Sequence, residues 1–451
     1  MSFAKRFQHS LESLCAPIEK SNYVVAYSGG VDSHVLLFLC KELNLSVRAV
    51  HIHHGLQDCA DEWVKHCLDT CKHMDVGLEV IYVDANKKKG ESPEETARNV
   101  RYQALQQCLL PNDVLLTAQH LDDQAETLLL QLFRSASSAG LSAMPATRTV
   151  GHHIQLRPLL SFSRNEIENF AKKNSLNWVE DPSNQDTAIE RNFIRRDILP
   201  LLIERWPEVK SQLSTVASLQ ANNLDVLEDM AAIDLASALS MHANSELTII
   251  EVVSMLSLDR LKSLSSSRLL NLLRYWIIET LQIKPTKNLL EEIENALIHT
   301  RPDASPDIVY SDFAFKKFQE NLYLIKSNIV SDSPKEISWN PSGPLNFPEL
   351  NIQLTTKSSH GSGLSNQLLD QSLHIRFRKG GEKFHPAGRR HSQSLKKLFQ
   401  EGCIPPWERD VIPLIYFGDK LIAVGGLWVS QAFAAGAGER GWLPRLRYMK
   451  T

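Results

Sequence analysis

The stretch Ser28-Gly29-Gly30-Val31-Asp32-Ser33 decides the fold class of the chain. It follows an apolar run at residues 23–27 and precedes a helix-like run at 34–43, so it lies where a strand turns into a helix. Such turns bind phosphate in parallel sheets, because glycines let the backbone approach an anion and the helix directs its first N–H groups towards it. We therefore predict an anion site here, with the hydroxyls of Ser28 and Ser33 as further donors.

Asp32 indicates a nucleotide bound with a divalent cation rather than a bare anion. A carboxylate among phosphate donors repels the ligand unless a cation lies between them. The turn lacks the GxxxxGK[ST] pattern and no lysine follows the glycines, which argues against a kinase or a GTPase. For this string alone, a serine-glycine turn that merely ends a strand is the alternative.

Strand-like and helix-like segments alternate along the first two hundred or so residues. Strands are predicted at residues 23–27, 46–53, 78–83 and 113–118, and helices at 34–43, 61–74, 93–110 and from Asp122 onward. This βαβ repetition predicts an α/β fold with an N-terminal doubly wound parallel sheet, whose ligands bind at the carboxyl ends of the strands.

Polar residues follow the second and fourth predicted strands, so they should converge with the glycine turn. HIHHGL begins at His51, and HLDDQAET begins at His120. Asp122 and Asp123 begin a helix, where either one alone is explained as a capping residue. Together with Asp32 they form an oxygen-rich set suited to Mg²⁺, and the sequence does not say which of the two binds the metal.

Two pairs of arginines have helical spacing. Arg98 and Arg101 share a face of the third helix, and Arg191 and Arg195 are four residues apart in RNFIRRDILP. Exposed arginines are usually solvated, but beside a pyrophosphate leaving group they supply forked donors to charge that builds up in the transition state. The second pair follows a turn-rich stretch, EDPSN, and without context this region predicts a loop leading into an ordinary helix.

The bulk composition is that of an ordinary globular protein. The 451 residues, 43% apolar and 22% charged, suffice for two or three domains with separate cores. Residues 1–20 carry charges of both signs, and no segment is long enough to span a bilayer, so we expect a cytoplasmic protein without a membrane partner. Seven cysteines without a CxxC pair favour free thiols over disulfides or a zinc site.

The net charge of −3 conceals a basic cluster in the C-terminal region. Its cations are Arg376, Arg378, Lys379, Lys383, Arg389, Arg390, Lys396 and Lys397, opposed only by Glu382. Such a patch can neutralise several backbone phosphates of a nucleic acid. As an isolated charge run it is more simply a solvated face.

Taken together, these strings resemble the tRNA(Ile)-lysidine synthetase family of PP-loop, or N-type ATP pyrophosphatase, enzymes. SGGVDS, HIHHGL, ARNVRY, AQHLDDQAET, EDPSN and RNFIRRDILP occur in the family's order and approximate spacing, and the run from Arg378 to Leu414 looks like its terminal domain. The resemblance implies a Rossmann-like PP-loop domain (1–215), a helical tRNA-recognition domain (216–332), a linker (333–350) and a small α+β tRNA-binding domain (351–451). Helical periodicity at residues 266–281 and 286–298 agrees with the second of these.

The resemblance also implies an activity. ATP, with Mg²⁺, would adenylate the carbonyl oxygen on carbon 2 of the wobble cytidine in an isoleucine tRNA with a CAU anticodon. The amine of L-lysine would then attack that carbon and expel AMP, which changes codon reading from AUG to AUA. No stable protein partner is expected.

Roles for individual residues follow from the same resemblance. Ser28, Gly29, Gly30, Val31, Asp32 and Ser33 would hold the nucleotide, Asp32 with Asp122 or Asp123 the metal, and Arg98 or Arg101 the α-phosphate, while His120 would assist proton removal or position the phosphate. Glu126 would orient lysine or accept its proton, with an exposed helical glutamate as the alternative. Arg191, Asn192 and Arg195 would contact the target nucleotide, and Lys379, Arg389, Arg390, Lys396 and Lys397 the tRNA stem.

Three other functions compete with this one. A tRNA thiolase of the same superfamily needs reactive cysteines, and none stands next to SGGVDS in the sequence. A PP-loop synthetase acting on a small metabolite has no use for a basic terminal domain. A tRNA-binding protein without catalysis has no need of Asp32 and Asp123.

Overall fold

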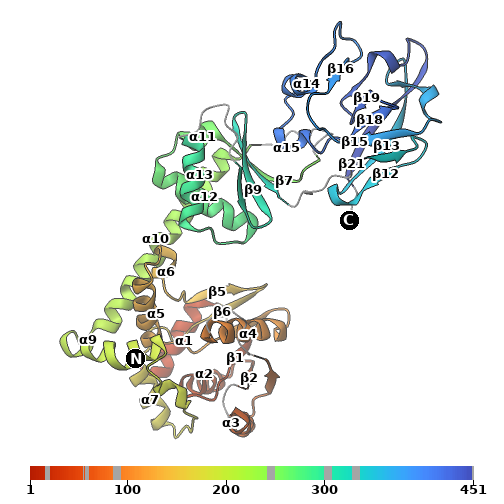
Figure 1. Cartoon of the computed structure of the whole chain (residues 1–451). Coiled ribbons are helices and arrows are strands. Elements are labelled where there is room, and N and C mark those ends of the chain that lie inside the picture. Colours follow the sequence, from red (N-terminus) through yellow and green to blue (C-terminus); the bar gives the residue numbers. More distant parts are fainter. Residues whose placement is uncertain are drawn as a thin grey trace. The chain divides into compact units, whose positions relative to one another are not determined.

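The computed structural model describes residues 1–15, 21–53, 55, 60–84, 93–240, 249–298, 307–327 and 336–448. The chain divides into two compact units, Met1–Val226 and Leu227–Thr451 (Figure 1). His54 and Leu56 of the HIHHGL string and residues 333–335 of the predicted linker lie outside the described residues.

A six-stranded sheet in the order β3-β2-β1-β4-β6-β5 forms the centre of the first unit. Its strands are β1 (Asn22–Ala26), β2 (Val47–His53), β3 (Leu78–Tyr82), β4 (Asp113–Leu116), β5 (Thr147–Val150) and β6 (His153–Leu156). All pairings are parallel except that of β5 with β6. The predicted parallel sheet is confirmed. The β5–β6 hairpin has no counterpart among the predicted strands.

Helices connect these strands and extend beyond them. They are α1 (Phe3–Leu14), α2 (Val31–Glu42), α3 (Ala60–His73), α4 (Pro93–Cys108), α5 (Leu121–Phe133), α6 (Ser138–Leu141), α7 (Arg164–Lys173), α8 (Glu190–Phe193), α9 (Leu199–Arg205) and α10 (Val209–Ala238). Helix α2 begins at Val31, three residues before the predicted start, so Asp32 and Ser33 lie in its first turn.

Both faces of the sheet are covered, because successive side chains of a strand point to opposite faces. Tyr23 and Val25 of β1 belong to one buried cluster with residues of α1, α2 and α7. Val24, between them, belongs to another with Leu105 of α4 and with Leu109, the residue that follows this helix. This is the doubly wound arrangement, and it leaves the carboxyl ends of the strands for polar residues.

The second unit begins with helices packed on a small antiparallel sheet in the order β7-β10-β9-β8. The elements are β7 (Val252–Ser257), α11 (Leu258–Lys262), α12 (Ser266–Leu281), α13 (Lys287–Ile298), β8 (Asp307–Tyr310), β9 (Phe313–Phe318) and β10 (Asn321–Lys326). The predicted helices are present, but the purely helical description of this region is corrected by the sheet. Its β9–β10 hairpin turns at Gln319 and Glu320, which lack the Asn-Gly signal of a hairpin, although Gln319 has a φ of +50°.

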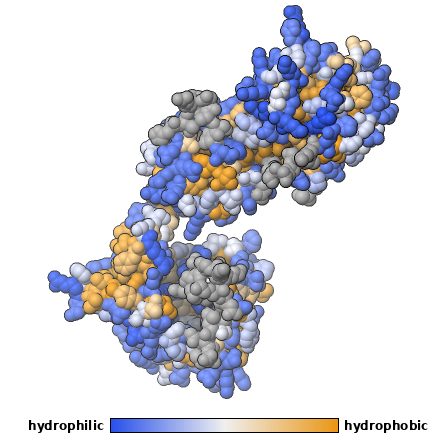
Figure 2. Space-filling view, in the orientation of Figure 1, coloured by the Kyte–Doolittle hydropathy of each residue, from blue (hydrophilic) through white to orange (hydrophobic). Residues whose placement is uncertain are grey.

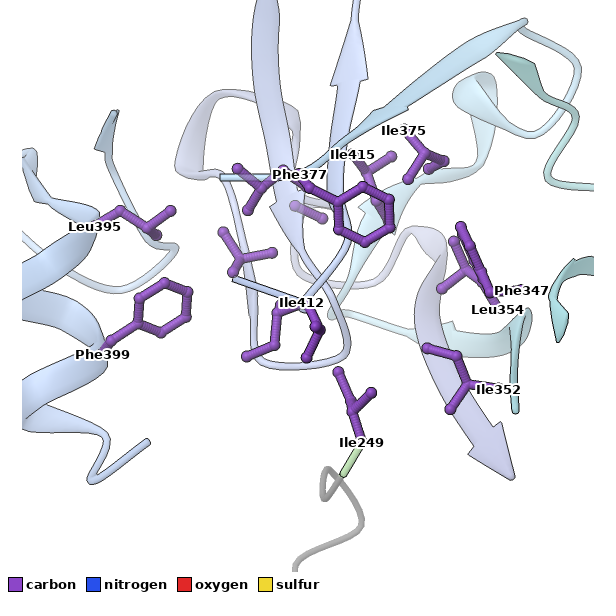
Figure 3. Packing of buried hydrophobic residues seen from close by; sticks show 14 of the residues in the cluster. Ile249, Phe347, Ile352, Leu354, Ile375, Phe377, Leu395, Phe399, Ile412 and Ile415 are labelled. Carbon is purple, nitrogen blue, oxygen red and sulfur yellow. The ribbon is translucent and has the colours of Figure 1, made fainter. Parts of the chain in front are cut away.

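Two antiparallel sheets enclose the core of the C-terminal region, in the orders β11-β15-β18-β19-β20 and β12-β13-β21-β14. Their strands are β11 (Ile337–Trp339), β12 (Leu345–Phe347), β13 (Ile352–His360), β14 (Leu364–Ser365), β15 (Leu373–Arg376), β18 (Leu414–Phe417), β19 (Lys420–Val424), β20 (Trp428–Val429) and β21 (Arg440–Tyr448). The strands β16 (Lys383–Phe384) and β17 (Gln393–Ser394) and the helices α14 (Leu395–Glu401) and α15 (Pro406–Arg409) complete the region. Figure 3 shows Phe399 of α14 and Ile352 of β13 in the same buried cluster. The α+β prediction is confirmed.

Residues 337–347 differ from the predicted linker. Strand β11 pairs with β15, and β12 pairs with β13. Trp339 and Phe347 are buried in the C-terminal core. The Ser and Pro content of this stretch suggested a linker, whereas its two aromatic side chains place it in the sheets. No helix of the described residues is both long and apolar enough to cross a membrane.

Glu408 joins the segment before β7 to the C-terminal core. Its carboxylate accepts hydrogen bonds from Ile249 N at 2.9 Å and Ile250 N at 3.1 Å. Ile249 itself lies in the core cluster (Figure 3). Burial raises the pKa of Glu408 to about 7, although the two N–H groups act in the opposite direction.

The pKa of Glu408 is 4.5 in its ordinary state and about 7 in the folded protein. We therefore expect the unfolding free energy of the second unit to fall as the pH rises between these two values. The folded state binds the proton of Glu408 more tightly than the unfolded state does. This stabilisation is fully present below pH 4.5 and is lost as the pH rises through about 7. Urea unfolding of wild type and Glu408→Gln across this range tests the point. The glutamine side chain of the variant does not titrate, so its unfolding free energy should lack this fall. The same pH dependence of the unfolding free energy in both proteins would contradict the prediction.

Candidate active site

The glycine turn joins β1 to α2 and leaves the first turn of that helix without a side-chain cap. Gly30 is the N-cap residue of α2. Ser28 Oγ lies 3.1 Å from Ser33 Oγ, and Ser33 Oγ donates to Gly30 O at 3.0 Å, so the two hydroxyls hold the turn in shape. Uncapped helix N–H groups together with two hydroxyls are the donors that a phosphate group needs.

Gly29 is the tightest point of this turn. Its φ is +84°, and a Cβ at this position would lie 2.9 Å from Cys67 Sγ and 3.1 Å from Val179 Cγ2. Its carbonyl accepts a hydrogen bond of 3.1 Å from Val179 N. The turn is therefore enclosed between α3 and the segment that follows α7.

Gly29→Ala is expected to lower the stability of the first unit and to weaken nucleotide binding. Gly30→Ala is the control, and its loss of stability should be smaller. Alanine at a positive φ costs about 1–2 kcal/mol before any clash with Cys67. Gly30 has a φ of −73°, and a Cβ there would lie 3.5 Å from Ser28 Oγ, an ordinary contact. Thermal unfolding of the two variants measures the difference, and equal losses would contradict the role given to Gly29.

His120 lies between two of the predicted acidic residues. Its Nε2 is 3.7 Å from Asp32 Oδ1 and 3.4 Å from Asp123 Oδ2. Asp32 Oδ2 receives a hydrogen bond of 2.5 Å from Arg164 Nη1, while Asp32 Oδ1 is buried and has no hydrogen-bond partner among the described residues. Asp32, His120 and Asp123, from the ends of β1 and β4, therefore form one polar cluster, as the fold predicts.

Asp122 faces away from this cluster. Its Oδ2 accepts from Arg164 N at 2.9 Å, and its Oδ1 pairs with Lys210 Nζ of α10. His120 Nδ1 is 3.9 Å from Asp122 Oδ2, so Asp122 lies on the opposite side of the imidazole from Asp32. The geometry favours Asp123 over Asp122 as the partner of Asp32.

The two neighbouring carboxyls have opposite pKa shifts. Burial raises the pKa of Asp32, although His120 and Arg164 oppose the shift. At Asp123 burial acts in the same direction, but His120, Arg191 and the backbone N–H of His120 outweigh it and lower the pKa. Burial without enough compensating charge is what a bound cation would relieve at Asp32.

A magnesium ion fits this cluster only as an ion shared with phosphates. No group of three or more His, Cys, Asp or Glu side chains within the described ranges is arranged to hold a metal by itself. Mg²⁺ commonly takes one or two carboxylates and completes its shell with water and phosphate oxygens. The unpartnered Asp32 Oδ1, with Asp123 nearby, meets that requirement.

Glu126 is fully buried and is bound by two arginines. Arg191 Nε donates to it at 2.8 Å, and Arg195 donates through Nε at 2.6 Å and Nη2 at 2.9 Å. Arg191 Nη2 also contacts Asp123 Oδ1 at 2.8 Å. The exposed-glutamate alternative is therefore wrong, and in this state both oxygens of Glu126 are used by the protein.

The arginine pair shares a face, as its spacing of four residues predicts, and the helix widens just after Arg191. Residues Ile194–Ile198 form a π-helical turn between α8 and α9. Burial would lower the pKa of Arg191 and Arg195, but Asp123 and Glu126 outweigh it and raise both. Asn192 lies between them in sequence, and its Nδ2 donates to Ser183 O and Asp186 O at 2.9 and 2.8 Å. The Asn192 amide therefore holds the EDPSN turn, and its contact with the target nucleotide stays a prediction.

The chain matches three family models in order. They are a PP-loop domain over residues 3–202, a TilS substrate binding domain over 256–323 and a TilS substrate C-terminal domain over 373–448. A tRNA(Ile)-lysidine synthase of Coxiella burnetii is 40% identical over 94% of this chain and 92% of its own length. One of Methylococcus capsulatus is 39% identical over 96% and 97%. The chain belongs to the tRNA(Ile)-lysidine synthase family. This membership confirms the resemblance and the PP-loop fold.

The basic cluster of this family member divides into paired and unpaired cations. Arg376 pairs with Glu336, Arg378 with Asp410, and Arg389 and Lys397 share Glu401. The other four, which have no ion pair among the described residues, are exposed: Lys379, Lys383, Arg390 and Lys396. Figure 2 shows a mainly hydrophilic surface over this region, around α14 and β16.

The structure brings to the site several further residues that the sequence patterns do not predict. Arg164 contacts Asp32, and its position could have been found from the capping box of Ser163 and Glu166 that opens α7 after β6. Lys210 gives no such signal, because it belongs to a long helix far along the chain. Arg98 and Arg101 are exposed on α4, and Arg98 lies over the ring of Tyr102, 5.8 Å from its centroid.

Proposed function

We propose that this protein joins L-lysine to carbon 2 of the wobble cytidine in the isoleucine tRNA with a CAU anticodon, with ATP converted to AMP and diphosphate. The observation that carries the proposal is the ordered match of a PP-loop domain and both TilS domains in one chain. A PP-loop supplies adenylation to many enzymes, whereas the two TilS domains restrict the acceptor. A cytoplasmic location agrees with a tRNA substrate.

The glycine turn would hold the phosphates of ATP, and Asp32 with Asp123 would hold Mg²⁺. The ion, when bound, supplies positive charge that offsets the charge of the phosphates. Ser28, Ser33 and the first N–H groups of α2 orient the nucleotide. Of the pair Arg98 and Arg101, Arg101 is the better candidate for binding the α-phosphate. Asp181 is among the charges that act on it. Asp181 lies two residues after Val179, which donates a hydrogen bond to Gly29 in the glycine turn.

His120 would position Asp32 and Asp123 and pass a proton between the cluster and the reacting groups. Its Nε2 lies within 4 Å of both carboxylates. Arg191 and Arg195 remain partly exposed, with 27% and 37% of their side-chain surface accessible, and would contact the target nucleotide with that surface. Lysine would approach the same cluster, so Glu126 would act on it through the two arginines.

The domains would divide the work as the resemblance implies. Residues 1–215 would carry the chemistry, and residues 216–332 and 351–451 would recognise tRNA. A thiolase reaction is disfavoured by Cys67, the cysteine next to the glycine turn. That thiol is buried and burial raises its pKa to about 12, so it is not poised for nucleophilic chemistry.

Incubation with labelled lysine, ATP, Mg²⁺ and bulk tRNA tests the proposal. The label should enter one minor isoleucine tRNA, and AMP should form in equal amount. Label in a free metabolite, or a product that requires a sulfur donor, would remove the lysidine assignment.

Arg390→Ala is expected to weaken tRNA binding several-fold and to lower the slope of log affinity against log salt by about 1, because one phosphate contact is lost. Arg378→Ala is the matched control, since Arg378 is already paired with Asp410 at 3.1 Å. Filter binding over a range of salt measures both. An unchanged slope for Arg390→Ala would return the cluster to a solvated face.

A further inference from the structure

Arg157 is a buried cation that the reaction described above does not use. It follows β6 and is only 2% exposed. Its Nε donates to Gln119 Oε1 at 3.2 Å and its Nη1 to the carbonyl of Pro145. Within the part of the chain that the structure describes, Arg157 forms no ion pair, and these two hydrogen bonds go to neutral oxygens. A buried charge without a counter-ion is costly unless a ligand supplies one.

Two further arginines gather around the same place, next to Tyr102. Arg98 of α4 and Arg148 of β5 lie over its ring, 5.8 and 5.4 Å from the centroid. Gln155, which is paired with Arg148 across the β5–β6 hairpin, donates to the Tyr102 hydroxyl at 3.5 Å. We call Arg98, Tyr102, Arg148 and Arg157 the Tyr102 cluster.

The cluster has an exposed rim and a buried base. Arg98 and Arg148 are exposed, and like Arg157 they have no ion pair among the side chains that are described. Burial lowers the pKa of Arg157, and Arg148 and Arg98 act in the same direction, whereas Tyr102 opposes the shift. Three positive groups thus raise one another's electrostatic energy, which an anion bound at the rim would relieve.

We infer that the Tyr102 cluster binds the backbone phosphates of the acceptor RNA next to the nucleotide that reacts. The inference rests on the proposed function and extends it to a surface that the active-site cluster does not include. Gln119, which binds Arg157, directly precedes His120, so the cluster adjoins the reacting groups at the ends of β4 and β6.

The position of the cluster favours RNA over ATP. The strand order places β4 between β1, which carries the glycine turn, and β6, which precedes Arg157. Neighbouring strands are about 4.8 Å apart, and β6 is two strands away from β1. The cluster therefore lies roughly 10 Å from the glycine turn, where the phosphates of ATP would bind. A polymer whose reacting base enters the active site places its own phosphates at such a distance.

The number of arginines favours RNA over the carboxylate of lysine. One carboxylate has two oxygens, and a single bidentate arginine already occupies both. Three guanidinium groups, two of them at the surface, suit successive phosphodiesters that lie across the rim.

Arg148→Gln tests the inference, with Lys172→Gln as the control. Lys172 is an exposed cation of α7, which packs on the opposite face of the sheet from α4, so the charge change is matched. The probe is a stem-loop RNA with the CAU anticodon loop, bound to the full-length protein over a range of salt. KM for ATP and for lysine is measured with the same variants.

We expect Arg148→Gln to weaken RNA binding several-fold and to lower the salt slope by about 1, with KM for ATP and lysine unchanged and the control like wild type. A raised KM for ATP or lysine with unaltered RNA binding would overturn the inference in favour of a small anion. No change in any of these values would also overturn it. If wild type binds the stem-loop with this dependence on Arg148 but attaches no lysine to full tRNA, the proposed function fails and the phosphate site stands.

Discussion

Asp32→Ala is expected to lower AMP formation by a factor on the order of a thousand or more, while tRNA retention at low salt stays close to wild type. Asp32 is the carboxylate at the glycine turn whose Oδ1 has no hydrogen-bond partner among the described residues. Its removal takes away the group that would hold the cation of the nucleotide. Arg164, which loses one partner, is 38% exposed and can be solvated by water, so the fold should survive.

Glu168→Ala is the control for Asp32→Ala. Glu168 is the other carboxylate bound to Arg164, at 2.7 Å, and it lies on α7. AMP formation should hardly change in this variant. Adenylation that survives in Asp32→Ala, or tRNA retention that disappears with it, would refute the assignment of nucleotide binding to this turn.

Glu126→Ala is expected to destabilise the first unit by about 3–5 kcal/mol, because it leaves Arg191 and Arg195 without their shared buried carboxylate. Glu126 is fully buried, and both of its oxygens accept from these arginines. Urea unfolding measures the loss. Glu126→Gln keeps the shape but not the charge, so its loss should be smaller, and lysine transfer should fall in both variants because the arginines are no longer held.

Glu190→Ala is the matched control for Glu126→Ala. Glu190 also pairs with an arginine, Arg134, but both side chains are largely exposed. Its removal should cost no more than about 1 kcal/mol. If Glu126→Ala unfolds like wild type and raises only KM for lysine, the carboxylate serves the substrate directly and its structural role is refuted.

The parallel sheet and the glycine turn could be predicted because their signals are local. Each of the first four strands is a short apolar run that ends in polar or glycine residues, and the βαβ rule then places those ends together. Asp32, His120 and Asp123 meet for this reason. Such a prediction needs no knowledge of which side chains from distant parts of the chain complete the site.

The partners of these residues could not be predicted, because they depend on packing between distant segments. Helix α5 buries Glu126 completely and leaves Leu132 and Phe133 more than half exposed, the reverse of what hydropathy suggests. The spacing of Arg191 and Arg195 predicts that they share a face, but nothing in it predicts Glu126 as their partner. Arg157 lies beside Gln119 only because β6 pairs with β4.

The hydrogen bond from Val179 to Gly29 has a consequence for the order in which substrates bind. Val179 precedes the EDPSN turn, and Asn192 ties that turn to the helix that carries Arg191. These hydrogen bonds therefore link the glycine turn to the helix that carries Arg191, which we propose contacts the RNA. If ATP shifts Gly29 and these bonds pass the shift to Arg191, ATP changes the affinity for RNA, and thermodynamic reciprocity then requires RNA to change the affinity for ATP by the same factor.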